Sequence, residues 1–177
     1  MVSAAATEQF LAVPLLAEVA REARLSLVES MEESQVKAGT TVLGQTQTLD
    51  QLSFLIEGTV AVTHDFKDGR RETITTLKAP AVFGMPSFFL GADSLVSIQA
   101  VTDVRILTLS HPSHERLRRE NPKAAEALAL ASVRELAARF DMLVRRVSDH
   151  MIEHNDAAPR ASEWAKFRTQ LFEDAGS

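Results

Sequence analysis

The sequence predicts an α+β protein in which an antiparallel β-roll of the jelly-roll type is flanked by N-terminal helices and a long C-terminal helix. Apolar residues recur at helical spacing up to about residue 34, alternate with polar ones over much of residues 36–109, and then return to helical spacing. Six of the seven glycines lie in the alternating zone, where turns are expected. Residues 123–155 contain no glycine or proline, which favours one long helix.

The N-terminal helical segment is expected to span residues 1–34. Its apolar side chains, from Phe10 onwards, recur at near-helical spacing. Because proline cannot continue a helix, Pro14 is expected to divide this segment into a short turn and a longer helix.

The β-roll is expected to span residues 35–120 and to contain about eight short strands. Its four clearest strands alternate β-branched or apolar residues with polar ones, over 52–56, 59–63, 71–77 and 104–109. The pair Asp68-Gly69 predicts a hairpin tip between two of them. A short helix from Ser113 is expected to end at Asn121-Pro122.

The long C-terminal helix is expected to span residues 121–155, followed by a short helix over 156–177 that carries Trp164, Phe167 and Leu171 on one face. In the long helix, an apolar stripe recurs at alternating intervals of four and three residues, the spacing of a helix that packs along a partner helix. The stripe could instead pack on the chain's own β-roll. We expect a homodimer through Val133, Leu136, Phe140, Leu143 and Val147.

Composition excludes several classes of protein. The net charge of −5 argues against a generic nucleic-acid binder, and the absence of cysteine excludes disulfides and thiolate chemistry. No apolar stretch reaches the ~18 residues of a membrane span. A secretory signal is not expected, because no lysine or arginine precedes Arg21. The cytoplasm is therefore the expected location.

The order of these elements resembles the cyclic nucleotide-binding domain of the catabolite-activator/fumarate-nitrate-regulator superfamily. The resemblance rests on residues 10–16, 39–44, 52–62, 82–90 and 112–120. It implies the β-roll described above, a phosphate-binding cassette that begins near Phe83-Gly84, and a long helix that commonly mediates dimerisation.

The cassette departs from the family pattern at two positions. In the family, a glutamate after Phe-Gly holds the ribose 2′-hydroxyl, and an arginine further on pairs with the cyclic phosphate. With Phe83-Gly84 and Ala100 as anchors, Met85 stands at the glutamate position and Ser94 at the arginine position. No lysine, arginine or histidine lies between residues 78 and 105, and Pro86 removes a backbone amide that would face the anion. Binding of cyclic AMP or cyclic GMP is therefore not expected.

Two interpretations of this degenerate cassette remain open. Its large apolar residues fill the former pocket, or they line a pocket for a different, less charged small ligand. Haem is weakly supported, because cysteine is absent and the predicted strands offer only His64 as a histidine ligand. No cofactor is expected. The candidate pocket residues are Phe83, Gly84, Met85, Pro86, Ser87, Ser94, Leu95 and Ser97.

No catalytic or metal site is expected. Residues 150–154 match the H-x-x-E-H pattern of inverted zinc proteases, but a third ligand would have to come from the few residues after Asn155. We interpret this motif as a solvated helix end. His64 alone does not make a cupin-type metal site, and His111 and His114 are expected to be surface residues at a helix start.

We therefore expect a regulatory module without enzymatic activity, which acts through dimerisation or through an unknown protein partner. Direct DNA binding is not expected, because the residues after Asn155 are too few for a helix-turn-helix and are not notably basic. The alternative function is a sensor of a different, less charged ligand in the same pocket.

Overall fold

The structure is a computed structural model that describes residues 2–48 and 50–153, with side chains up to residue 149. The chain divides into two compact units, Met1–Val133 and Arg134–Ser177. The expected final helix over 156–177, with Trp164, Phe167 and Leu171, lies outside the described residues. Within the described part of the chain, no helix is both long and apolar enough to span a membrane.

Three helical pieces precede the roll. They are α1 (Ala4–Leu11), the 3₁₀-helix η1 (Pro14–Leu16) and α2 (Arg21–Glu29). Pro14 is the first residue of η1, where its missing N–H costs no hydrogen bond, so it separates α1 from the later helices as expected. The hydroxyl of Ser3 caps α1 by accepting a hydrogen bond from the amide of Ala6 at 3.2 Å.

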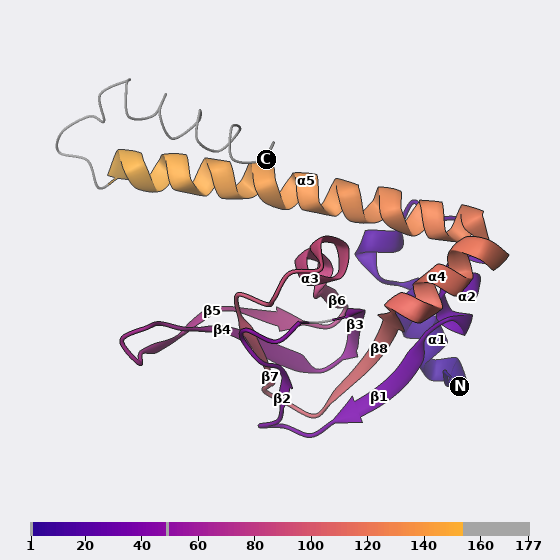
Figure 1. Ribbon diagram of the computed structural model, residues 1–177, viewed down its shortest axis with the longest axis horizontal. Coiled ribbons are helices and arrows are strands. Elements are labelled where there is room, and N and C mark those ends of the chain that lie inside the picture. The colour runs from indigo at the N-terminus through magenta and orange to yellow at the C-terminus, as the bar shows by residue number, and fades with distance from the viewer. Residues whose placement is uncertain (1, 49, 154–177) are drawn as a thin grey trace. The chain divides into compact units, whose positions relative to one another are not determined.

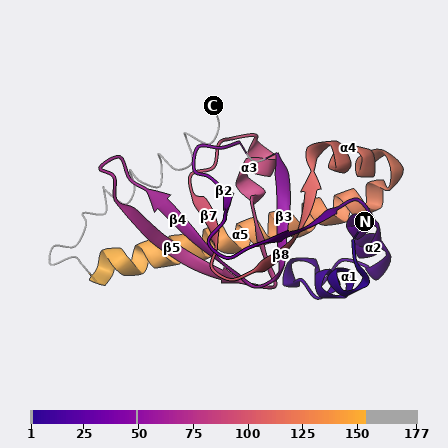
Figure 2. The same cartoon turned by 90° about the horizontal axis from the view of Figure 1, so that it is seen from below.

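Within the described residues, eight strands form two antiparallel four-stranded sheets, which confirms the predicted β-roll (Figure 1). Sheet A has the order β1 (Glu32–Val36), β8 (Val104–Ser110), β3 (Gln51–Glu57) and β6 (Ala81–Phe83). Sheet B has the order β2 (Thr41–Leu43), β7 (Ser97–Ala100), β4 (Thr59–Asp65) and β5 (Arg71–Lys78). Figure 2 shows α1 and α2 at one end of the roll and the β4–β5 hairpin at the other.

Strand β1 begins at Glu32, inside the segment that the sequence assigned to the N-terminal helices. It pairs with β8 in the register Glu32 to Thr108 and Val36 to Val104. Its sequence is Glu-Glu-Ser-Gln-Val, and none of its side chains is fully buried. A strand at the edge of a sheet with polar residues on both faces carries no apolar alternation, so the pattern that located the other strands is missing here.

The core of the roll lies between the two sheets. Each strand except β1 and β5 contributes buried side chains to it, and the set is Leu43, Leu55, Val60, Phe83, Ile98, Ala100, Val104 and Ile106. On the other face of sheet A, the ring of Phe54 meets the ring of Phe10 from α1 edge-on, at 5.0 Å between centroids. Helix α1 therefore covers the outer face of β3.

The remaining helices follow the chain order that the sequence predicts. They are α3 (Met85–Leu90), α4 (His111–Glu120) and α5 (Pro122–Glu153). Helix α4 begins two residues before Ser113, because the hydroxyl of Ser110 accepts a hydrogen bond from the Ser113 amide and caps the helix there. Asn121 separates α4 from α5 and its side-chain oxygen accepts a hydrogen bond from the Ala124 amide, at the first turn of α5. The long C-terminal helix is thus confirmed.

Candidate functional site

The cassette is the connection from β6 to β7, which contains α3. Gly84 directly precedes α3 and Gly91 directly follows it, with φ angles of +85° and +66°. Both angles lie in the left-handed region, which glycine adopts at little cost, so the two glycines fix where this six-residue helix begins and ends.

Met85, which the sequence analysis aligns with the family's glutamate, is part of the core. Met85 has 0% of its surface exposed, and its neighbours Phe83 and Phe88 on the same segment are also buried. A side chain in this position contacts protein on all sides. Met85 thus contributes to the apolar packing beneath α3.

Ser94, which the sequence analysis aligns with the family's arginine, forms hydrogen bonds within its own loop. Ser94 is buried, and its hydroxyl donates a hydrogen bond to the Val96 carbonyl at 2.8 Å. Its backbone exchanges two hydrogen bonds with the loop after β2, from the Thr46 amide to the Ser94 carbonyl and from the Ser94 amide to the Gln47 carbonyl. Ser94 therefore joins two loops of the roll.

A second set of contacts, centred on Gln45, ties these loops to the end of β4. The amide side chain of Gln45 donates to the Asp65 carbonyl at 3.0 Å and accepts from the Asp65 amide at 2.7 Å. The backbone amide of Gln45 donates to the hydroxyl of the buried Ser97 at 2.9 Å. Sequence analysis missed Gln45, because a polar residue in a turn gives no signal of a partner twenty residues away.

His64 holds the far end of the cassette connection. Its Nδ1 donates to the Leu95 carbonyl at 2.8 Å, and its ring lies edge-on against that of Phe66, with centroids 4.7 Å apart. The Leu95 side chain, by contrast, is 79% exposed. The imidazole of His64 is thus used as a structural donor from β4.

The arginines of the β4–β5 hairpin are paired with acids. Arg71 contacts Asp65 with Nη2 at 2.8 Å, and Arg70 contacts Asp68 at 2.8 Å and Glu72 at 2.9 Å. The hydrogen bond from Arg71 lowers the pKa of Asp65, which is the expected effect of a cation on a carboxyl group. These two cations are therefore already compensated by carboxylates of the hairpin.

The predicted pocket residues differ in exposure. Pro86 and Leu95 lie on the surface, and Gly84 is half-buried. The other five are buried, namely Phe83, Met85, Ser87, Ser94 and Ser97. The cassette therefore presents mainly α3, the Leu95 segment and backbone groups to a ligand, while the three serine hydroxyls are withdrawn from the surface.

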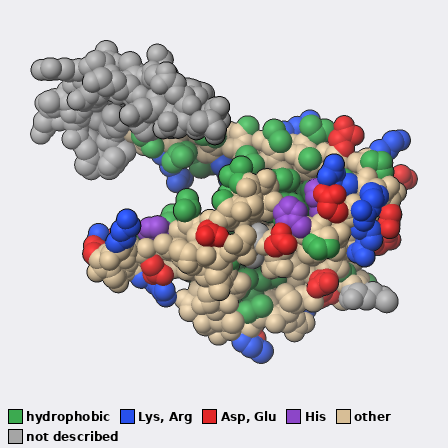
Figure 3. All heavy atoms as spheres, in the orientation of Figure 1, with side chains coloured by type: hydrophobic (Ala, Val, Ile, Leu, Met, Phe, Trp, Pro, Cys, Tyr) green, Lys and Arg blue, Asp and Glu red, His purple; other side chains and the backbone are tan. Residues whose placement is uncertain are grey.

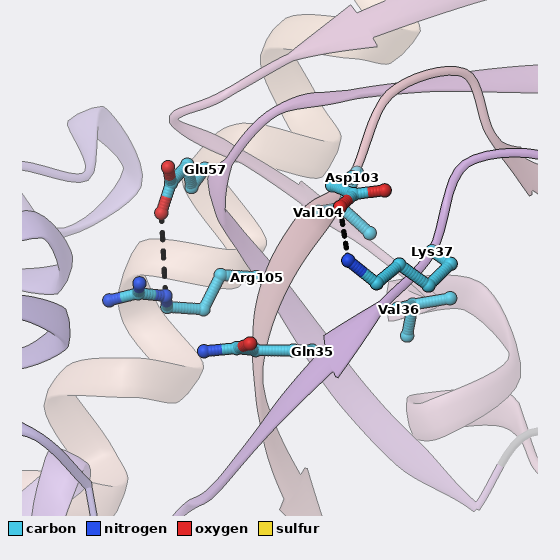
Figure 4. A pocket seen from close by; sticks show the side chains of 7 residues that line it. All are labelled: Gln35, Val36, Lys37, Glu57, Asp103, Val104 and Arg105. Atoms are coloured by element: carbon cyan, nitrogen blue, oxygen red, sulfur yellow. Dashed lines mark hydrogen bonds and ion pairs between the residues drawn. The ribbon is translucent and has the colours of Figure 1, made fainter.

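A separate hollow of about 220 Å³ lies on sheet A, between β1, β3 and β8 (Figure 4). Lys37 contacts Asp103 at 2.6 Å, and Arg105 lies 3.4 Å from Glu57. The hydrogen bond between Lys37 and Asp103 raises the pKa of the lysine and lowers that of the acid. Since each cation of the hollow faces a carboxylate, its charges compensate one another.

His111 and His114 pack against α3, which corrects the expectation that they are simply surface residues. The ring of His111 stacks on Phe88 with centroids 4.3 Å apart, and that of His114 meets the same phenylalanine edge-on at 5.4 Å. Both histidines are half-buried. From the sequence, a histidine at the start of a helix is expected to be exposed. The contact with the buried Phe88 depends on the tertiary structure.

The residues of the predicted dimer stripe retain exposed surface on the single chain. Val133 is 62% exposed, Phe140 and Leu143 are also exposed, and Leu136 and Val147 are half-buried. In the first turns of α5, the buried residues are a different set, Ala124, Ala125, Leu128, Ala131 and Ser132.

The H-x-x-E-H motif of residues 150–154 lies outside the side chains that the structure describes. Among the described residues, no group of three or more histidine, aspartate or glutamate side chains has the arrangement of a metal site.

Comparisons with known proteins agree with the fold. A sequence model of the cyclic nucleotide-binding domain matches residues 33–121. The N-terminal domain of a transcriptional regulator from Streptomyces coelicolor is 26% identical; the match covers 75% of this chain and 95% of that domain, with a TM-score of 0.66. A comparison with curated protein sequences gave no match.

Two further solved structures share the fold at lower identity. A cyclic nucleotide-binding domain from Methylobacillus flagellatus is 20% identical, with 81% of this chain and 83% of that domain covered and a TM-score of 0.73. The catabolite activator protein of Thermus thermophilus is 23% identical, with 76% of this chain and 63% of that protein covered and a TM-score of 0.64. Because the family model matches about half of the chain and the fold agrees, the chain belongs to the cyclic nucleotide-binding domain family.

Proposed function

We propose that this chain is a non-catalytic, cytoplasmic regulatory module that has lost the chemistry for binding cyclic nucleotides and acts through a homodimer or another protein partner. The observation that supports the loss of nucleotide binding is the burial and bonding of the two residues at the signature positions. Met85 is fully buried in the core, and the hydroxyl of Ser94 donates a hydrogen bond to the Val96 carbonyl in its own loop. Neither side chain offers a group to a ribose or to a phosphate.

Electrostatics supports the loss of nucleotide binding. A cyclic phosphate that leaves water needs a cation or several donors, and a hydrogen bond to a charged group contributes ~1.5–3 kcal/mol. The cassette supplies no lysine, arginine or histidine from residue 79 to residue 104. The two hairpin arginines are paired with acids, and Asp93 adds a negative charge beside Ser94. The balance of charge in the cassette therefore opposes an anionic ligand.

Calorimetric titration of the purified chain with cyclic AMP and cyclic GMP tests this part of the proposal. We expect no binding at nucleotide concentrations up to about 1 mM, which corresponds to less than ~4 kcal/mol of binding free energy. Non-cyclic AMP serves as the control for weak, non-specific anion binding. A micromolar Kd for either cyclic nucleotide, with no comparable binding of AMP, contradicts the proposal.

The geometry of α5 supports the dimer. At 3.6 residues per turn, the stripe centred on Phe140 is displaced by roughly 120° around the helix from the buried face that includes Leu128. A stripe that served only to pack on the body of the chain would continue that buried face. The stripe instead forms a second apolar surface, with the four-and-three spacing of the core positions of a coiled coil.

The other faces of α5 carry charged pairs. Arg139, beside the stripe, contacts Glu135 at 2.7 Å, and Arg145, on the opposite face, contacts Asp141 at 2.8 Å, each pair one helical turn apart. A helix with one apolar seam and charged residues on its other faces is the usual pattern of a helix that associates with another helix in water.

Sedimentation of three proteins tests the dimer: the wild type, Phe140→Asp and the matched control Met142→Asp. Both residues are exposed on α5, but Met142 lies roughly 160° away from Phe140 around the helix. We expect the wild type and Met142→Asp to be dimers and Phe140→Asp to be a monomer. A monomeric wild type, or equal disruption by both substitutions, contradicts the dimer.

The alternative function, a sensor of a less charged ligand, would need polar groups that are free to bind it. Ser94 and Ser97 are both buried and hydrogen-bonded within the roll, which favours the filled pocket. A thermal-shift screen with uncharged metabolites separates the two functions, because a ligand of the folded state raises the melting temperature by mass action.

A further inference from the structure

Phe88 of α3 lies in a cluster with two histidines of α4. His111 stacks on its ring at 4.3 Å with 24° between the planes, and His114 meets it edge-on at 5.4 Å with 65° between the planes. Phe88 is 1% exposed. Figure 3 shows histidine side chains gathered where α3 and α4 meet. The contact between the cassette helix and α4 thus consists largely of one apolar ring held between two titratable rings.

His111 also ties the backbone of α3 to α4. Its Nε2 donates to the Phe88 carbonyl at 2.8 Å and lies 3.5 Å from Oδ1 of Asp50. Both partners are acceptors, so Nε2 is the nitrogen that carries the hydrogen-bonding proton. The Phe88 carbonyl belongs to the last turn of α3, where the helix itself provides no partner. His111 therefore ties the end of α3 to the start of α4.

His114 has a different electrostatic environment. Burial is the main cause that lowers its pKa; Glu115 opposes the shift, and Arg118 and His111 add to it. A hollow of about 310 Å³ beside His114 is also lined by Arg118 and by Glu126 of α5. Helix α3 contributes no ionisable side chain. A charged His114 would thus lie beside Arg118 and His111, with the carboxylates of Glu115, Glu126 and, beyond His111, Asp50 as partial compensation.

We propose that Phe88, His111 and His114 form a pH-operated latch, which holds the cassette helix α3 against α4 while His114 is neutral and loosens it when acid places a charge on His114. The direction follows from burial. A base that is desolvated in the folded chain favours the neutral form there, so protonation favours the open arrangement. Loosening begins as the pH falls through the ordinary histidine value of about 6.5 and is complete below the folded value.

The latch connects the cassette to the base of the long helix. Helix α4 leads through Asn121 directly into α5, and the same asparagine caps that helix. In this arrangement, a change in pH acts on the cassette helix α3, the element that would contact the nucleotide in a ligand-binding relative. The latch is independent of the proposed loss of nucleotide binding, because its parts lie outside Met85 and Ser94.

Hydrogen exchange of α3 measured by NMR on the full chain between pH 7.5 and 5.5 tests the latch. The reporters are the amides of Phe88 and Gly91, which donate to the carbonyls of Gly84 and Ser87. After correction for the intrinsic exchange rate, we expect their protection to fall on acidification, because the open arrangement binds a proton more readily than the closed one. The fall should have the same midpoint as the titration of the His114 ring.

Three variants complete the experiment. His114→Gln removes the charge and should make protection independent of pH, whereas His64→Gln, the control histidine on β4, should retain the fall in protection. His114→Phe keeps an aromatic contact with Phe88 and should remain protected at both pH values, which guards against a glutamine variant that packs poorly. Protection that does not change in the wild type, or a His114 titration with no change in α3, overturns the latch. So does a full response in His114→Phe.

Discussion

The two sheets of the β-roll differ in how much of them the chain covers. In sheet A, five consecutive residues of β3, Leu52–Ile56, are buried, because the roll interior covers one face and α1 covers the other. In sheet B, β5 has no buried residue, and its Ile74 is 59% exposed. The same fold thus contains one strand enclosed on both faces and one edge strand open to water.

The covered strand β3 tolerates little change in sequence, whereas the open parts of sheet B tolerate more. A strand covered on both faces must be apolar along its whole length, and any change in volume is felt by its neighbours. The two sheets therefore meet different parts of the cassette connection: α3 packs against β3 of sheet A, whereas hydrogen bonds join the loop after α3 and the loop after β2 to sheet B. Exposed residues of these loops can be exchanged at lower cost than the buried residues under α3, which is consistent with the proposed loss of nucleotide binding.

The largest expected effect is in sheet A. Phe54→Ala should lower the free energy of unfolding by ~3–5 kcal/mol, because it removes a buried ring that packs against Phe10. Ile74→Ala on the open strand should change it by no more than ~0.5 kcal/mol. Urea denaturation of both variants measures the contrast between the sheets. Similar losses in the two variants would show that β5 is covered in solution.

An intermediate effect is expected at the loops that close the roll. Gln45→Ala removes both hydrogen bonds to the Asp65 backbone and should cost ~1–2 kcal/mol. Hydrogen exchange of the Asp65 amide should become faster. Gln99→Ala, which removes one exposed hydrogen bond to the Gly39 carbonyl, is the matched control and should cost less. An effect of Gln45→Ala no larger than that of the control would show that the loop closure contributes little.

The smallest effect concerns the edge of sheet A. Glu33 accepts hydrogen bonds from the Ser3 amide at 2.7 Å and from its hydroxyl, and the amide contact is the main cause that lowers the pKa of Glu33. The depressed pKa gives stability that is present above the ordinary value of 4.5 and lost as the pH falls through the folded value. Glu33→Gln should therefore be less stable than wild type at about pH 7, and the difference should shrink towards about pH 3.

A series of urea denaturations from neutral to acid pH checks this expectation. Glu32→Gln, on the exposed face of the same strand, is the control and should show no such convergence with the wild type. A constant difference between Glu33→Gln and wild type at all pH values would assign the effect of the substitution to packing.

Much of the fold could be predicted from the sequence, because four strands carry regular apolar alternation. Strands β3, β4, β5 and β8 begin within one residue of where that alternation placed them, and α5 begins one residue after the expected start of the long helix at residue 121. Strand β1 could not be located, since Glu32 and Glu33 lie in an edge strand with no buried residue, where polar side chains are tolerated on both faces. Local patterns predict elements whose faces differ and miss those whose faces are alike.

The candidate site was predictable only in part. The identities of Met85 and Ser94 at the two signature positions are visible in the sequence, but their burial is not. The roles of Gln45 and His111 depend on contacts with Asp65 and Phe88, which lie twenty and twenty-three residues away. Such contacts follow from the assembled tertiary structure, and a single sequence contains no periodic trace of them.

The junction at Asn121 has one more consequence. Besides capping α5, its side-chain nitrogen donates to the hydroxyl of Ser26 in α2 at 2.9 Å. The side chain of Asn121 therefore links α2 to the start of α5, and Asn121 is also the only residue between α4 and α5. If a protein bound to α5 rotated that helix, the displacement would therefore act on α2 through the bond between Asn121 and Ser26. The first thirty residues are thus a place where such binding would change the structure.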